Sequence, residues 1–212
     1  MHVRPLLWAI VWVVGLGAVV LGLSNTASAQ DKLLGFRGGF VLSGDGELEF
    51  EQGGTSANLD YEEDTNFGLN GYLLFPIGRN LTLGPSLWYI PEYELDIELL
   101  GNTVAVSGDD LSMLNANALL EYALPLGSVD GFLYAEAGLA MIFPADDDDD
   151  DDAFVGLNLG GGFGLQFPIS GNVVFRSDLM LSLYQASRES NNVDVTFAGT
   201  RIMLNFGVAF GI

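Results

Sequence analysis

The feature that most constrains this chain is a strict alternation of apolar with small or polar residues, repeated along most of its length. Residues 201–212 show it most clearly, because Ile202, Leu204 and every second residue after them are apolar. Side chains on a β-strand point alternately to opposite faces, whereas a helix spaces its apolar residues three or four apart. The segment therefore predicts a strand with one continuous apolar face. The sequence offers no amphipathic helix to cover that face, so we expect lipid to cover it.

Seven earlier segments alternate in the same way, which predicts eight strands in all. They are residues 34–43, 67–75, 81–89, 114–124, 133–143, 157–167 and 175–183. Three short turns contain a proline, and between them lie four long polar connections. The turns are at residues 75–78, 124–127 and 167–170, and the connections are at residues 45–64, 93–110, 146–152 and 186–192.

Short turns that alternate with long loops are typical of transmembrane β-barrels, whose even strand number lets the last strand pair with the first. We therefore predict an all-β fold: a single, eight-stranded, antiparallel, up-and-down transmembrane β-barrel. The second connection is also strand-prone, which predicts a hairpin about Gly101-Asn102. The apolar positions change from odd to even after Phe197, which indicates either a β-bulge near Ala198-Gly199 or a loop that ends there.

The N-terminus has the three parts of a secretory signal peptide. Arg4 is followed by an almost unbroken apolar run at residues 6–23, and Ala27-Ser28-Ala29 forms a small-x-small cleavage site. We predict a cleaved signal peptide at residues 1–29 and a barrel domain at residues 30–212. The alternative is an uncleaved membrane anchor, since the apolar run is long enough to span a bilayer.

The charge balance is strongly acidic, with 28 Asp and Glu residues against 7 Lys and Arg residues and a net charge of −21. Such a surface repels nucleic acid, so no nucleic-acid partner is expected. Hydrophobic residues nevertheless make up 49% of the chain, and there are 28 glycines. Acidic loops joined to apolar strands would reconcile these two facts.

Six charged residues alternate with the apolar face and are therefore predicted to point into the barrel. They are Arg37, Glu121, Glu136, Arg176, Asp178 and Arg201. The interior of an eight-stranded barrel is only wide enough for side chains to fill, and buried charges are costly unless they pair. We predict a plugged, salt-bridged lumen in which Arg201 pairs with one of the three carboxylates; the alternative is a proton or ion path. Gly160, Gly162 and Gly164 are predicted to leave space for the arginines.

Catalytic and metal-binding chemistry finds little support. The only histidine, His2, lies in the predicted signal peptide, and there is no cysteine, so we expect no enzyme and no cofactor. The acidic run contains a weak candidate metal site at Asp146, Asp148, Asp150 and Asp152. It does not match a calcium-binding EF-hand loop, because Asp151 and Leu157 occupy the positions that require Gly and Glu. A solvated loop is the simpler interpretation.

Aromatic residues near predicted strand ends are candidates for the girdles that flank a membrane, although ordinary packing explains any single one nearly as well. They are Trp88, Tyr89, Tyr93, Phe143, Phe154 and Tyr184.

Residues 34–212 resemble the small outer-membrane β-barrel superfamily, which includes the transmembrane domain of outer-membrane protein A, the opacity proteins and OmpW. The alternating strands, the short proline turns and the closing strand that ends in Phe210-Gly211-Ile212 carry the resemblance. In this superfamily the closing strand usually ends in an aromatic residue, whereas Ile212 ends it here. The resemblance implies a Gram-negative outer-membrane location, periplasmic termini, contact with outer-membrane lipid and lipopolysaccharide, and assembly by the barrel-assembly machinery. We expect a monomer.

Fold specifies function weakly in this group, because one barrel type hosts several functions. We expect a structural anchor or surface interaction protein with acidic extracellular loops. The main alternative is an OmpW-like narrow conduit for small or hydrophobic solutes. A lipid-modifying enzyme would require a nucleophile and a base that the sequence does not offer. A soluble lipocalin-type binder would need more charged residues on its outer face.

Overall fold

The computed structural model describes residues 32–63, 65–91, 95–99, 102–106, 111–127, 129–144, 153–190 and 192–212. The predicted signal peptide and the acidic run at residues 146–152 lie outside the described residues. The described part is all β. Its strands are β1 (Leu33–Gln52), β2 (Thr55–Glu63), β3 (Phe67–Pro76), β4 (Leu81–Ile90), β5 (Leu95–Leu99), β6 (Asn102–Val106), β7 (Leu111–Pro125), β8 (Asp130–Pro144), β9 (Phe154–Ser170), β10 (Val173–Ser190) and β11 (Val193–Gly211).

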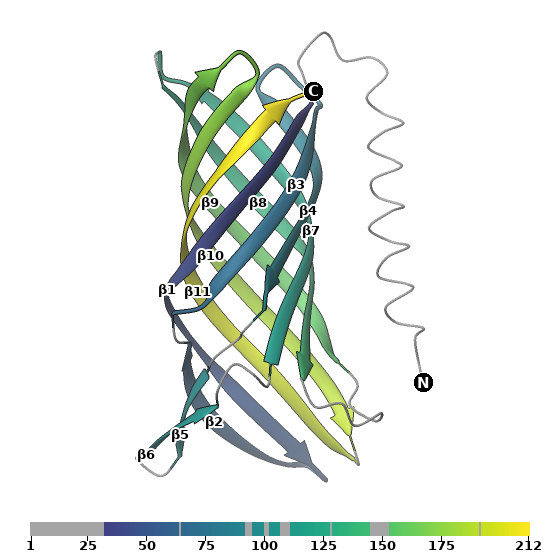
Figure 1. The fold of residues 1–212 in the computed structure, drawn as a ribbon. Helices are drawn as coiled ribbons and strands as arrows, with labels where there is room; N and C mark the ends of the chain where they lie inside the picture. Colours follow the sequence, from purple (N-terminus) through teal and green to yellow (C-terminus); the bar gives the residue numbers. More distant parts are fainter. Residues whose placement is uncertain are drawn as a thin grey trace.

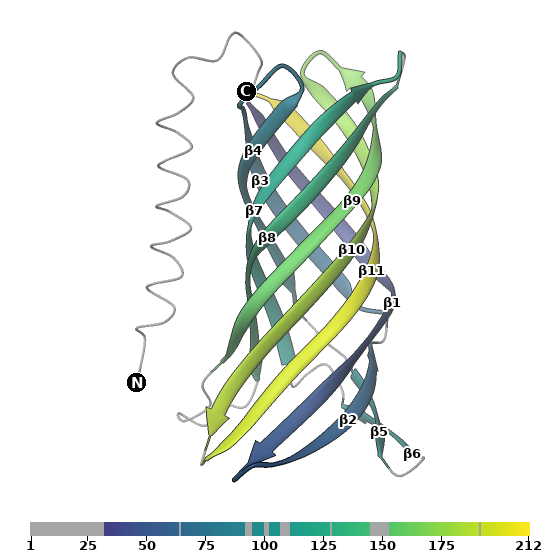
Figure 2. The same cartoon turned by 180° about the vertical axis from the view of Figure 1, so that it is seen from behind.

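Eight of these strands form a closed antiparallel ring in the order β1, β3, β4, β7, β8, β9, β10 and β11 (Figures 1 and 2). The ring closes because β11 pairs with β1 along nearly its whole length, from Leu33 opposite Gly211 to Glu51 opposite Asp194. The predicted eight-stranded barrel is confirmed. The described residues hold no helix with the length and apolarity that a bilayer crossing requires.

Both described chain ends lie at the end of the barrel that carries the short turns. Lys32 and Ile212 exchange backbone hydrogen bonds there, and Gly211 donates to the carbonyl of Asn172 in the β9–β10 turn. In Figure 1 this end is at the top, beside the mark for the C-terminus. The short turns follow β3, β7 and β9, as their proline sequences predict.

The opposite end differs from the sequence prediction, because two of the four expected loops are strands. β1 continues to Gln52, turns through Gly53 and Gly54 and returns as β2, which pairs with β1 over nine residues. Both glycines have positive φ, at 60° and 83°, as a two-residue hairpin turn requires. Likewise β10 and β11 extend to Ser190 and Val193, so the expected connection at residues 186–192 is mostly strand. The prediction of long loops at these two places is wrong.

These extensions stand beyond the membrane-spanning part of the barrel. β1 is 20 residues long, or roughly 66 Å at about 3.3 Å per residue. A transmembrane strand needs only about 9–11 residues. Figure 1 shows β1, β2, β10 and β11 projecting past β3, β4, β7 and β8, with β5 and β6 beside β2. β5 pairs with the end of β2 and β6 pairs with β5, which confirms a hairpin near Gly101-Asn102.

A β-bulge lies in the first strand rather than the last. The register between β1 and β11 shifts between Val41 and Ser43, so Leu42 is the extra residue. β11 runs against β10 without a shift, and its odd residues face inward throughout. The bulge predicted near Ala198-Gly199 is therefore wrong, and so is the alternative loop. Phe197 is apolar and inward-facing, because the lumen lining changes from polar to apolar at this level while the strand keeps its phase.

The outer wall is a belt of exposed apolar side chains. Phe40 and Phe206 are 47% and 42% exposed, Leu159 is 55% exposed and Leu181 is 52% exposed. Inside the ring lie two packed clusters, one around Tyr61, Tyr184 and Phe197 in the extended half and one around Tyr72, Trp88 and Tyr134 in the half near the short turns. Apolar residues outside and packed polar and aromatic residues inside are the arrangement of a barrel immersed in lipid.

Candidate functional site

The six charged residues predicted to point inward are all buried in the lumen. They come from five strands of the ring: Arg37 from β1, Glu121 from β7, Glu136 from β8, Arg176 and Asp178 from β10, and Arg201 from β11. Arg201 is 1% exposed, and none of the six exceeds 7%. Each side chain occupies an inward position because the alternation along its strand puts its apolar neighbours on the lipid side.

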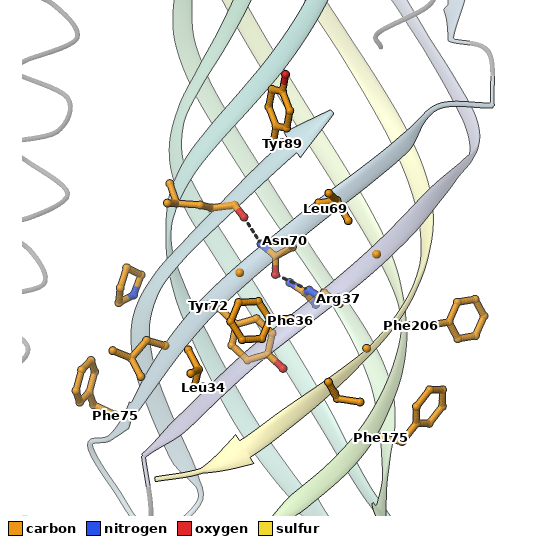
Figure 3. Close-up of a pocket in the computed structure, with 17 residues that line it drawn as sticks. Leu34, Phe36, Arg37, Leu69, Asn70, Tyr72, Phe75, Tyr89, Phe175 and Phe206 are labelled. Atoms are coloured by element: carbon orange, nitrogen blue, oxygen red, sulfur yellow. Dashed lines mark hydrogen bonds between the residues drawn. The ribbon is translucent and has the colours of Figure 1, made fainter. Parts of the chain in front are cut away.

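Arg37 is the centre of the first cluster. Its Nη1 atom donates to both carboxylate oxygens of Asp178, at 3.2 and 3.1 Å, and its Nη2 atom lies 3.9 Å from Glu136. Its Nε atom donates to Asn70 at 2.8 Å, a bond drawn in Figure 3. Asp178 also accepts a hydrogen bond from Tyr134 at 2.5 Å. One buried cation is therefore held by two carboxylates and an amide.

Aromatic rings enclose the same guanidinium group. Its carbon lies 4.9 Å from the centre of the Trp88 ring, 5.0 Å from that of Tyr134 and 5.4 Å from that of Tyr72. Cation–π attraction is stronger where water is excluded. Trp88, Phe154 and Tyr184 are buried inside the ring, so the prediction that these three belong to a membrane girdle is wrong.

Arg176 forms a second pair nearer the short turns. Its Nη2 atom donates to Glu121 at 2.5 Å, and its Nη1 atom donates to the Tyr72 hydroxyl at 2.8 Å. The guanidinium carbon lies 3.8 Å from the centre of the Phe132 ring. Tyr72 thus lies beside both Arg37 and Arg176 and joins the two pairs into one packed layer.

Arg201 contacts the carboxylate of Glu63, which was not among the residues predicted to face inward. Its Nη2 atom lies 3.3 Å from Glu63, which also accepts a hydrogen bond from Tyr184 at 2.5 Å. The hydroxyl of Tyr184 is 2.7 Å from that of Tyr61. Glu63 ends β2, in the segment predicted to be a loop. The sequence did contain a signal that Glu63 faces inward: it lies two residues after Tyr61, so on a strand the two side chains share one face.

Asparagine and serine side chains extend the polar lumen, and these too were not predicted. Ser182 donates to Asn158 at 2.8 Å, Asn158 donates to Asn117 at 3.2 Å and Asn117 donates to Glu136 at 3.0 Å. Asn70 donates to Ser86 on the adjacent wall. These amides occupy inward positions of strands whose alternation was recognised, so the inward face could have been read in full. The chain of bonds satisfies groups that would otherwise be buried without partners.

The inward glycines make room for aromatic and acidic side chains rather than for arginines. A Cβ atom on Gly162 would lie 2.8 Å from the Tyr134 ring, one on Gly164 2.4 Å from the Phe132 ring, and one on Gly160 2.9 Å from Glu136. The prediction that these three glycines accommodate the arginines is therefore wrong. Gly207 has that role, because a Cβ there would lie 2.6 Å from the Cβ of Arg37.

The site therefore contains three arginines and four carboxylates in direct contact, with aromatic rings and amides between them. Among the described residues, no group of three or more His, Cys, Asp or Glu side chains could hold a metal ion. The candidate metal residues Asp146, Asp148, Asp150 and Asp152 lie outside those residues. Each of the three arginines already has a carboxylate partner, so the arrangement holds its own charged side chains in place.

The lipid-facing belt and the closed ring define a small, eight-stranded, transmembrane β-barrel of the outer-membrane type. Solved structures share this fold. The outer membrane protein OprG from Pseudomonas aeruginosa matches with a TM-score of 0.63 and 14% identity, over 87% of this chain and 96% of that one. Neisserial surface protein A matches with a TM-score of 0.54 and 14% identity, over 88% of this chain and all of that one.

The outer membrane protease OmpT from Escherichia coli matches with a TM-score of 0.51 and 8% identity, over 89% of this chain and all of that one. At these identities the likeness concerns the fold. No family model and no curated protein sequence matches the chain.

Proposed function

We propose that this protein is a non-catalytic, monomeric outer-membrane barrel whose lumen is plugged by paired charges and which presents an acidic sheet at the cell surface. The observation that carries the proposal is the contact of all three predicted inward arginines with a carboxylate: Arg37 with Asp178, Arg176 with Glu121 and Arg201 with Glu63. Charges lining a water-filled channel would not need such partners.

The packing between the charged layers supports the same conclusion. Four large side chains in the lumen are almost completely buried: the exposed fraction is 0% for Met113, 1% for Phe132 and 2% for both Met180 and Trp88. An open pore would leave inward side chains accessible to water. An OmpW-like conduit, the alternative, would need an apolar lumen cavity with a lateral opening, and the packed lumen supports the plugged barrel instead.

The acidic surface lies on strands, where carboxylates of neighbouring strands stand side by side. Asp45 is opposite Glu62, which is opposite Asp96, and Glu47 is opposite Asp60. Directly opposed like charges destabilise a sheet.

We propose that this acidic sheet faces the outside of the cell above the lipopolysaccharide, with both termini in the periplasm. This orientation puts the short turns at the periplasmic end, as is general for such barrels.

The plugged lumen predicts negligible conductance when the purified protein is reconstituted in planar lipid bilayers. A porin prepared in the same detergent is the positive control. Heat-modifiable migration in gel electrophoresis reports in parallel that the protein is folded. Folded protein that forms stable, large channels would refute the plugged lumen. Saturable uptake of a small apolar solute into liposomes would instead favour the conduit.

A further inference from the structure

The outer wall carries a hollow that the closed lumen does not explain. It has a volume of about 1250 Å³ and lies over β1, β3, β4, β10 and β11. Figure 3 shows residues that line it, with Tyr89 at one end, Leu34 and the buried Phe75 at the other, and Phe175 and Phe206 on one side. The outward-facing lining is almost entirely apolar: Phe36, Leu69, Leu87, Tyr89, Phe175 and Phe206.

Two glycines form the floor of this hollow. Gly38 stands between Leu69 of β3 and Phe206 of β11 in one row of paired residues. In the next row, Gly71 stands between Phe36 of β1 and Leu87 of β4. The two rows follow one another on the outward face, with the inward pair Arg37 and Asn70 between them. The missing side chain of Gly71 leaves a trough on β3 with large apolar side chains on both sides, and the Phe67 ring limits the trough at Gly38.

Gly71 is the more open of the two positions. A Cβ atom there would meet only the Phe36 ring, at 3.8 Å, whereas one on Gly38 would meet the Phe67 ring at 3.0 Å. The backbone of Gly71 is paired with Phe36 on one side and Leu87 on the other, so the floor belongs to a hydrogen-bonded sheet. An apolar group can lie on that floor without burying an unpaired amide.

We propose that this trough binds an acyl chain of an outer-membrane lipid in a fixed position, above Gly71 and between Phe36 and Leu87. The occupant follows from the location, because exposed apolar residues of the lipid-facing belt continue from the hollow along the same wall: Phe40 on β1, Phe67 on β3, and Leu179 and Leu181 on β10. A soluble ligand would have to cross lipid to reach it. This inference rests on the proposed membrane location.

A chain in the trough gains contacts that a chain on a flat wall lacks. Side chains on three sides and the sheet below surround it, and many small dispersion contacts add up to appreciable binding. Association between apolar groups within a membrane depends on this close packing, since the surrounding lipid is equally apolar. The trough should therefore retain one lipid after the neighbouring lipids have been exchanged for detergent.

The test uses the full mature chain reconstituted with dimyristoylphosphatidylethanolamine, extracted in detergent and weighed by native mass spectrometry. The wild type should retain one lipid. Gly71→Leu fills the trough without a clash at its Cβ and should lower the retained fraction at least tenfold. The matched control is Ala137→Leu, which enlarges an exposed position on β8 and should retain lipid as the wild type does.

Equal lipid retention by wild type and Gly71→Leu would overturn the inference, as would a wild type that inserts in liposomes but retains no lipid. Liposome flotation of all three proteins separates this failure from failure of the proposed function. If none of them inserts, the membrane location itself is wrong. Heat-modifiable migration of each variant shows that a loss of lipid is not a loss of folding.

Discussion

Arg37 and Asp178 are 141 residues apart in the chain, yet their guanidinium and carboxylate groups meet at 3.1 Å inside the barrel. β11 lies between β1 and β10 in the ring, so the two side chains meet inside the lumen in front of β11. Asp178 also accepts hydrogen bonds from Tyr134 and Asn205, at 2.5 and 2.7 Å. Three side chains from three other strands therefore depend on this one carboxylate.

Substitution of Asp178 should be strongly destabilising. In Asp178→Ala, Arg37 keeps Glu136, at 3.9 Å, as its carboxylate neighbour, and two further donors lose their acceptor. Breaking a buried ion pair by removal of one member costs about 3–5 kcal/mol. Urea unfolding in liposomes should show this loss of unfolding free energy. The control is Asp194→Ala, at an exposed site. A surface substitution of this kind should change the unfolding free energy by no more than about 0.5 kcal/mol.

Arg201 should be coupled energetically to Glu63, because the two groups are in contact at 3.3 Å. A double-mutant cycle with Arg201→Met and Glu63→Gln should give an interaction energy of about 0.5–3 kcal/mol in unfolding free energy. The same cycle with Glu121→Gln should be close to additive, since Glu121 is held by Arg176. Coupling of Arg201 to Glu121 but not to Glu63 would contradict the lumen geometry.

Gly162 should tolerate no larger residue. A Cβ atom there would lie 2.3 Å from the backbone oxygen of Leu179 as well as 2.8 Å from the Tyr134 ring. Because a backbone atom cannot move aside as a flexible side chain can, Gly162→Ala should cost about 1–3 kcal/mol of unfolding free energy. Gly71→Ala, on the open outer wall, is the matched control, and equal stability of the two variants would refute the packing argument.

The hairpin at Gly53 and Gly54 should depend on their positive φ angles. The φ of Gly54 is 83°. A residue with a Cβ atom in the left-handed region costs roughly 1–2 kcal/mol. We expect Gly54→Val to increase proteolysis between β1 and β2 while the thermal unfolding of the barrel is unchanged. Ser56→Val, an exposed strand position next to the turn, should not increase cleavage.

The alternation of residue types predicted much of the fold because the direction of a side chain on a strand is a local property. It placed Arg37, Arg176 and Arg201 inside, and the short proline turns at one end. It misjudged the segment at residues 45–64, where exposed carboxylates such as Glu47 and Glu49 obscure the inward alternation of Leu48. Acidic residues suggested a loop there because strands disfavour them. The pairing of β1 with both β2 and β11 overrides that weak preference.

The sequence by itself determined the number of strands in the ring and the inward face of most of their length, since a period of two needs no information from distant residues. Only the tertiary structure decided which charges meet. Arg201 contacts Glu63, while Glu121 is held by Arg176 and Asp178 by Arg37. The stagger of strands in a closed barrel sets which levels of the lumen face one another. That stagger depends on the register of every strand pair together and on the bulge at Leu42, and no single strand's sequence contains it.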